Sequence, residues 1–321
     1  MKNPSLGRLL RLAVAAGLTA FLLWRSDPGK VLQAALHADL RWIAVAIALV
    51  AADRALMAYR WLVLLRPLAH ESLPPFRSIM RIFFVSTFLG TFLPSSVGGD
   101  AVRAVSLARH NVSGAASVAS VFMDRMLGVA SVLLLGVVAL PFAPDLARNG
   151  MVMVGLLLAA AACGVTVLLV FSARAATAAQ RLAAHAPIEL VRRAGHSVID
   201  AIQRYASSHL ELVNVLAGSL GVQILRVVQA YCLGMALGIQ VPILTYFAFI
   251  PLILLVMLLP VTINGLGTSQ AAFLWLFARV GVLPADAFAL SVLFVALGVV
   301  GNLPGGFLYA SGGTGERQPA G

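Results

Sequence analysis

Charged residues lie deep inside segments that are otherwise apolar and long enough to cross a lipid bilayer, among them Asp53, Arg54, Arg60, Asp124, Arg125 and Arg226. A charge at the centre of a membrane helix costs about 2.5–3.5 kcal/mol even on the most lenient insertion scale. Each of these side chains therefore needs a partner. Two interpretations account for them: ion pairs that hold helices together, or a polar cavity in which arginines bind phosphate through bidentate hydrogen bonds.

A break rich in proline and glycine follows the third apolar run. It reads Leu93-Pro94-Ser95-Ser96-Val97-Gly98-Gly99-Asp100, and Arg103 follows one helical turn later. We expect Asp100 to cap a short helix, and Gly98 and Gly99 to let a ligand approach the backbone closely. Because helix N-termini attract anions, Arg103 is predicted to contact a phosphate group, with Asp100 as its orienting partner.

A second break follows another apolar run and carries no charge. It reads Leu259-Pro260-Val261-Thr262-Ile263-Asn264-Gly265-Leu266-Gly267, and Gln270 comes shortly after it. Asn264, Gly265 and Gly267 predict a polar turn. An amide both donates and accepts hydrogen bonds, so this turn suits a glycerol, sugar or amide group better than it neutralises a phosphate. The alternative is a helix cap whose small residues allow close packing.

The elements that must position these residues are membrane helices. The chain has 321 residues, 60% hydrophobic and 11% charged, with a mean hydropathy of +0.95, whereas soluble domains carry about 25% charged residues. Apolar runs occur at about 9–24, 42–65, 79–97, 115–140, 151–171, 212–238, 243–263 and 286–310. They predict an all-α polytopic integral membrane protein, with about eight membrane segments in one domain over 1–310 and a disordered tail over 311–321.

The formal net charge of +11 is carried mostly by arginines in loops and at helix ends. This distribution is typical of the positive-inside rule, and no basic run alternates with exposed aromatic residues as in nucleic-acid binding proteins. Cys163 and Cys232 lie in apolar runs without metal-binding spacing. We therefore expect no nucleic-acid partner, no metal and no cofactor.

A polar stretch over about 174–205 predicts a cytoplasmic amphipathic helix. At 100° per residue, its apolar residues fall on one side, namely Ile188, Val191, Val198, Ile199, Ile202 and Tyr205. Arginines outnumber acidic residues here, which places the stretch in the cytoplasm. Its apolar side either lies in the membrane interface or packs against the protein's own membrane domain.

The topology requires one apolar run that does not cross. Lys2, Arg8 and Arg11 place the N-terminus in the cytoplasm, and no small-x-small cleavage site follows the first run, which we read as a retained helix. If every run crossed, the arginine-rich stretch would emerge on the wrong side. We expect the third run, 79–97, to be re-entrant, because non-helical backbone at membrane depth marks a buried or wet site. A plain surface loop is the alternative.

The two breaks share an order, with Leu-Pro first and glycines after. Upstream of them, Arg54 or Arg60 in one half corresponds to Arg226 in the other. We therefore predict two pseudo-repeats, about 1–140 and 206–310, that are inverted relative to each other, as is common in transporters. The two breaks should then meet near the membrane midplane from opposite sides.

Three stretches resemble the flippase-like family named for the lysylphosphatidylglycerol synthase transmembrane region: Phe92 to Arg103, Ala119 to Gly128 and Leu259 to Gly267. The resemblance covers nearly the whole chain. It assigns the site to Gly98, Gly99, Asp100, Arg103, Asp124, Arg125, Asn264, Gly265 and Gly267, to which we add Gln270, Arg54, Arg60 and Arg226. The family commonly has an Arg-Glu pair where this chain has Ser269-Gln270, which bears on headgroup preference and proton coupling.

The resemblance implies that an anionic or aminoacylated phospholipid, or a polyprenyl-linked lipid, is flipped across the bacterial inner membrane. In this family lysyl transfer belongs to a separate soluble domain, for which this chain has no length, so we expect no synthase activity. The alternatives are a membrane-embedded transferase and an accessory subunit that works with lipid-synthesis enzymes. A transferase would need catalytic carboxylates, and Asp100 and Asp124 are the candidates.

Overall fold

The computed structural model describes residues 36–68, 74–92, 96–110, 112–142, 148–185, 189–258 and 267–311, together with Gly29, Gln33 and Leu146. These residues are mainly helical, and no strand occurs among them. The predicted first membrane segment at 9–24 lies outside the described residues. So do most of the second break, at 259–266, and the predicted tail beyond Ser311.

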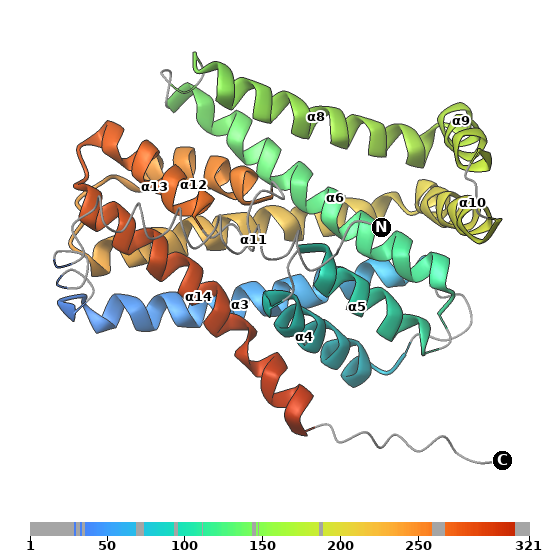
Figure 1. Cartoon of the computed structure of the whole chain (residues 1–321), viewed down its shortest axis with the longest axis horizontal. Helices are drawn as coiled ribbons and strands as arrows, with labels where there is room; N and C mark the ends of the chain where they lie inside the picture. Colours follow the sequence, from blue (N-terminus) through green and yellow to red (C-terminus); the bar gives the residue numbers. More distant parts are fainter. Residues whose placement is uncertain are drawn as a thin grey trace, which may run out of the picture.

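Figure 1 shows how the helices follow one another and where they lie. Their bounds are α3 (Leu40–Leu65), α4 (Phe76–Phe92), α5 (Ser96–Ala108), α6 (Gly114–Ala139), α8 (Gly150–Phe171), α9 (Ala173–Ala184), α10 (Glu189–Gln203), α11 (His209–Ala236), α12 (Ile243–Leu258), α13 (Thr268–Phe277) and α14 (Pro284–Ser311). Short 3-10 turns extend three of them, at η1 (Leu140–Phe142), η2 (Arg204–Ser207) and η4 (Ala278–Val280).

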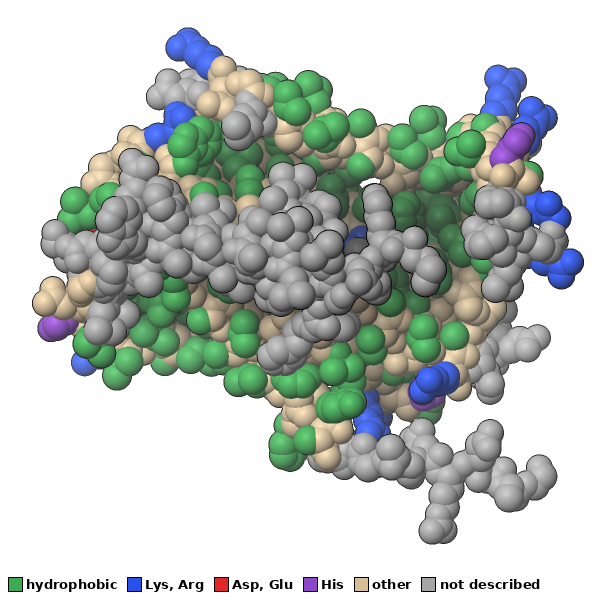
Figure 2. All heavy atoms as spheres, viewed as in Figure 1, with side chains coloured by type: hydrophobic (Ala, Val, Ile, Leu, Met, Phe, Trp, Pro, Cys, Tyr) green, Lys and Arg blue, Asp and Glu red, His purple; other side chains and the backbone are tan. Residues whose placement is uncertain are grey.

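Five helices of the described part are long and apolar enough to cross a membrane: Leu40–Leu65, Gly114–Ala139, Val152–Phe171, His209–Ala236 and Pro284–Ala310. They coincide with predicted apolar runs, and the shorter Ile243–Met257 coincides with another. Hydrophobic side chains cover much of the face seen in Figure 2, and basic side chains gather around α9 and α10. The predicted all-α polytopic membrane protein is confirmed.

Each half of the chain uses the same order of helices: a long helix, two short helices across a break, and a second long helix. The first long helices of the two halves, α3 and α11, pack side by side and antiparallel (Figure 1). At one end the Asp39 N–H donates to the Ala236 carbonyl (2.9 Å), and at the other the Tyr205 hydroxyl donates to the Leu64 carbonyl (2.8 Å). This antiparallel pair links the two halves of the chain along its length.

The first break joins two helices that fold back on each other. α4 ends at Phe92 and α5 begins at Ser96, so Asp100 lies inside the helix and the prediction that it caps the N-terminus is wrong. Gly98 and Gly99 are part of the helix, and Gly99 lies against the backbone of α4. A Cβ atom on Gly99 would lie 2.8 Å from the Ser86 carbonyl oxygen and 2.9 Å from the Gly90 Cα. The glycine therefore allows close packing of α5 on α4.

The helices that flank the second break also pack together, as α12 and α13. α13 starts after Gly267, whose φ of 85° favours glycine. The Gly267 N–H donates to the Gln270 Oε1 (2.5 Å), and the Ser269 hydroxyl donates to the same oxygen (3.0 Å). The Gln270 side chain therefore accepts a hydrogen bond from a backbone N–H that has no partner within the helix, in line with the cap alternative.

The last helix, α14, crosses α4 at very short range. A Cβ atom on Gly305 would lie 2.0 Å from the Phe84 carbonyl oxygen, and one on Gly306 would lie 2.7 Å from the Phe88 ring. Only glycine fits at such a crossing. The contact ties the end of the second half to the hairpin of the first.

The predicted amphipathic stretch forms two helices, α9 and α10, where one was expected. The apolar side of α10 packs on the membrane domain, because Ile202 and Tyr205 are buried in a core shared with α3, α4 and α6. Burial raises the pKa of the Tyr205 phenol, which stays protonated and donates to α3. Of the two alternatives for this helix, packing against the protein's own domain is observed.

The apolar core is divided into two clusters. One surrounds α12, α13 and the start of α14, and the other surrounds α4, α10 and the start of α6. Along α3, Val50 belongs to the first cluster and Ala58 to the second. Along α11, Val227 belongs to the first and Val215 to the second. Asp53 and Arg54 of α3 and Arg226 of α11 lie between these positions.

Candidate functional site

A cavity of about 360 Å³ occupies the region between the two cores. Seven helices contribute to its wall, and the lining residues that carry polar groups are Asp53, Arg54, Thr87, Thr91, Asp100, Arg103, Arg125, Arg226, Gln229 and Asn302. Both hairpins reach it, the first through Gly90 and Gly99 and the second through Leu254 and Met257. A second cavity, of about 210 Å³ between α6, α8 and α11, is lined almost wholly by apolar side chains.

Asp53 is the acidic centre of one part of the wall. It is 2% exposed and pairs with Arg54 (2.7 Å) and with Arg226 of α11 (3.3 Å). Arg54 also donates to the Gly298 carbonyl of α14 (3.1 Å). These contacts join α3, α11 and α14.

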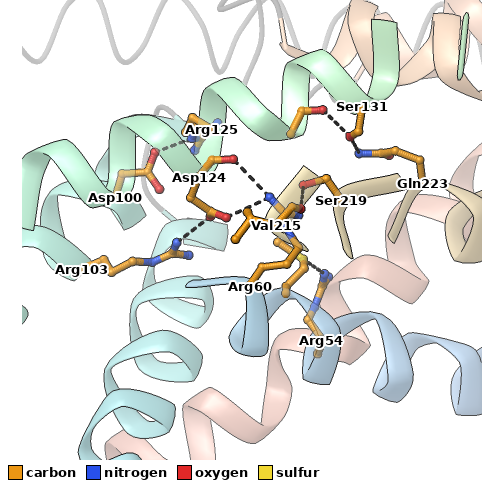
Figure 3. A network of polar contacts seen from close by, with 12 residues as sticks. Arg54, Arg60, Asp100, Arg103, Asp124, Arg125, Ser131, Val215, Ser219 and Gln223 are labelled. Atoms are coloured by element: carbon orange, nitrogen blue, oxygen red, sulfur yellow. Dashed lines mark hydrogen bonds and ion pairs between the residues drawn. The ribbon is translucent and has the colours of Figure 1, made fainter. Parts of the chain in front are cut away.

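Asp124 of α6 is the acidic centre of the other part. Arg60 of α3 donates to its Oδ1 (2.9 Å), and Arg103 of α5 donates to its Oδ2 (3.2 Å). Arg60 donates to the Asp124 carbonyl as well (3.2 Å). Figure 3 shows the two guanidinium groups on either side of the carboxylate. Three helices from the first half are therefore bonded through a single side chain.

Arg103, the predicted phosphate contact, is largely buried. Its guanidinium lies 5.2 Å from the Trp61 ring centroid and 4.8 Å from that of Phe83, and the residue is 6% exposed. These aromatic faces attract the cation. The predicted partnership of Asp100 with Arg103 is wrong, because Asp100 pairs with Arg125 and Arg103 pairs with Asp124 (Figure 3).

Two arginines remain accessible from the cavity. The side chain of Arg125 is 33% exposed and that of Arg226 is 25% exposed, whereas those of Arg60 and Arg103 are 4% and 7% exposed. Arg125 bonds to Asp100 through Nε. Arg125 and Arg226 are therefore the most exposed arginines of the cavity wall.

Neutral polar residues complete the wall, and the sequence analysis missed them. The Asn302 amide of α14 donates to the Thr91 hydroxyl of α4 (2.8 Å), while Gln229 of α11 is 4% exposed. Within the described residues, the Gln229 Nε2 and the Asn302 Oδ1 have no hydrogen-bond partner. The available signal was an amide inside an apolar run, since such groups are costly in a membrane.

The remaining predicted residues lie elsewhere. Arg60 and Asp124 stand behind the wall, in contact with Arg103, while Gly98 is half-buried in α5. Gly267 and Gln270 are buried at the start of α13 and do not line the cavity. Asn264 and Gly265 lie outside the described residues. The structure thus brings Gly99 and Asp100 of α5 together with arginines of α3, α6 and α11.

Comparison with known families decides the affiliation of the chain. The family model of the lysylphosphatidylglycerol synthase TM region matches residues 8–305. The chain belongs to this family. The match includes every residue that lines the cavity, and it confirms the resemblance found in the sequence. Membership relates this multi-pass membrane protein to lipid handling. No curated protein and no solved structure matches the chain.

Proposed function

We propose that this member of the family translocates a phospholipid or lipid-linked molecule across the bacterial inner membrane. The observation that carries the proposal is the cavity of about 360 Å³ between two apolar cores, with accessible Arg125 and Arg226 in its wall. A lipid headgroup that crosses a bilayer loses its hydration. Arginine side chains replace water with charge-assisted hydrogen bonds to phosphate, while the acyl chains stay in the lipid phase.

The arrangement of the two hairpins supports the proposal. The base of α4–α5 belongs to the core that contains α10, and the base of α12–α13 belongs to the opposite core. We infer that the hairpins enter the membrane from opposite sides as parts of inverted repeats, with the α9–α10 end and the N-terminus in the cytoplasm. Rocking of one half against the other would then expose the cavity to each side in turn.

A flipping assay tests the function directly. The purified full-length protein is reconstituted in liposomes that contain a fluorescent anionic phospholipid, and a membrane-impermeant quencher reports the outward fraction over time. We expect Arg226→Gln to slow exchange about tenfold, the effect of losing roughly 1.4 kcal/mol of headgroup binding. Arg226 is suited to this test because it is partly exposed and Asp53 retains Arg54.

Arg279→Gln provides the matched control. Arg279 is an exposed arginine that stacks on Trp275 (4.1 Å to the ring centroid), and it does not line the cavity. Its variant should exchange lipid at the rate of the unaltered protein. Equal rates for Arg226→Gln and Arg279→Gln would reject the cavity as the transport site, and no exchange by the unaltered protein would reject the function.

A further inference from the structure

The charged residues around the cavity do not balance. Among the described residues, five arginines (Arg54, Arg60, Arg103, Arg125 and Arg226) meet three aspartates (Asp53, Asp100 and Asp124), which leaves a net charge of +2. The excess positive charge lies on two groups of residues. Asp53 and Asp124 are each shared by two arginines, so each group carries +1, whereas Asp100 and Arg125 cancel.

Away from their first turns, the apolar segments contain no acidic residue other than these three aspartates. The chain contains 12 acidic residues, and nine of them are not in the network. Eight of the nine lie outside the apolar runs, and Asp286 stands in the first turn of α14. Among the described residues, no other carboxylate lines the cavity.

Unpaired donors in the wall point to the same kind of ligand. Within the described residues, the Nε atoms of Arg54 and Arg103 and the Nε2 of Gln229 are buried without a hydrogen-bond partner, as are two acceptors of the wall, Asp53 Oδ1 and Asn302 Oδ1. The three donor residues line the cavity as well. Buried donors without partners are rare, and phosphate oxygens are the acceptors that arginine binds best.

We propose that the cavity selects a lipid whose headgroup carries two negative charges, as a phosphate monoester or a diphosphate does, over singly charged and aminoacylated lipids. The inference rests on the proposed function and names its substrate class. A phosphate monoester carries about −1.5 to −2 at pH 7, which matches the excess of +2. A phosphodiester leaves +1 uncompensated, and an amino-acid ester adds a cation beside the arginines.

Native mass spectrometry of the detergent-solubilised full-length protein measures this selectivity. The probes are phosphatidic acid, phosphatidylglycerol and an aminoacyl ester of phosphatidylglycerol with matched acyl chains. We expect phosphatidic acid to bind about tenfold more tightly than phosphatidylglycerol, and the aminoacyl ester to bind most weakly. Equal binding of the first two lipids, or tightest binding of the ester, would overturn the inference.

Charge removal and pH provide two further arms. Arg226→Gln lowers the excess to +1, so the preference for phosphatidic acid should disappear, whereas Arg279→Gln should retain it. At pH 5 the monoester loses its second charge, since its second pKa is about 6, and its advantage should also disappear. A preference that persists in Arg226→Gln or at pH 5 would contradict charge matching.

Two further measurements distinguish a lipid phosphate from soluble phosphate, and failure of this inference from failure of the proposed function. Inorganic phosphate or pyrophosphate, at about 10 mM, should not displace phosphatidic acid, because the acyl chains add binding in the lipid phase. Displacement would mean that the cavity binds soluble phosphate. Selective binding without exchange in liposomes would reject only the function, and exchange without headgroup selectivity would reject only this inference.

Discussion

Asp124 shows why the charged residues of this protein cannot be assigned to one role. Its carboxylate holds Arg60 and Arg103 from two other helices, and the side chains of both arginines are largely buried. This part of the network is therefore the structural ion pairing that the first interpretation required. Arg125 and Arg226, by contrast, are partly exposed to the cavity. The first interpretation therefore holds for Arg60 and Arg103, and the second is our proposal for Arg125 and Arg226.

We expect Asp124→Asn to destabilise the protein by about 3–5 kcal/mol, because it leaves two buried guanidinium groups with a neutral partner. The measurement is thermal unfolding in detergent, compared with Arg279→Gln. The control removes only an exposed stacking interaction of at most about 1 kcal/mol. Equal melting temperatures for Asp124→Asn and the unaltered protein would mean that the network does not hold the first half together.

The sequence predicted which residues are charged within the membrane but not which of them pair. Positions such as Asp100 and Arg103 face the same side of one helix, and this spacing suggested a pair. The actual partners come from α6, because the orientation of α6 against α5 depends on packing that a helical wheel does not contain. Gln229 and Asn302 were missed because neutral amides barely change the hydropathy of a long apolar run.

At the scale of elements, the first break was located correctly, and the structure adds a packing role for one of its glycines. Pro94 and the following glycines indicated an interruption, and α4 and α5 do separate there. Gly99, however, lies within α5 against the backbone of α4, where it serves helix packing. Composition alone does not distinguish a glycine that admits a ligand from one that admits a neighbouring helix.

Gly99→Val should therefore disrupt the α4–α5 hairpin. The new side chain would meet the Ser86 carbonyl and the Gly90 Cα, which are backbone atoms that cannot rotate away. We expect a loss of about 3 kcal/mol in the free energy of unfolding, together with slower lipid exchange. Gly164→Val is the matched control, since no atom lies within 4 Å of a Cβ there and α8 exposes this position. Similar stability of the two variants would disprove the close approach.

At the scale of the whole molecule, the order of helices repeats and the two halves share their contacts. α3 packs on α11, α4 packs on α14 and α12 packs on α6. Each hairpin therefore contacts the last long helix of the other half. This reciprocal pattern supports the inverted repeats that were proposed from two Leu-Pro breaks. The wall of the cavity consequently contains residues from both halves, which no single segment of sequence could indicate.

The inverted arrangement predicts which side of the membrane each hairpin base faces. In a background with Cys163 and Cys232 replaced by alanine, Ala108→Cys and Ala278→Cys introduce thiols at the exposed ends of α5 and α13. Ala184→Cys, at the end of α9, marks the side of the arginine-rich helices.

A membrane-impermeant maleimide should label Ala108→Cys and Ala184→Cys from the cytoplasmic side and Ala278→Cys from the opposite side. The reason is that the core beneath Ala108 includes Tyr205 beside α10, whereas the core beneath Ala278 includes Phe277 and Tyr246 at the far end of α11. Labelling of all three thiols from one side would place both hairpins on the same face. The cavity could not then open to each side by rocking of the two halves, and the proposed transport mechanism would fail even if lipid bound there.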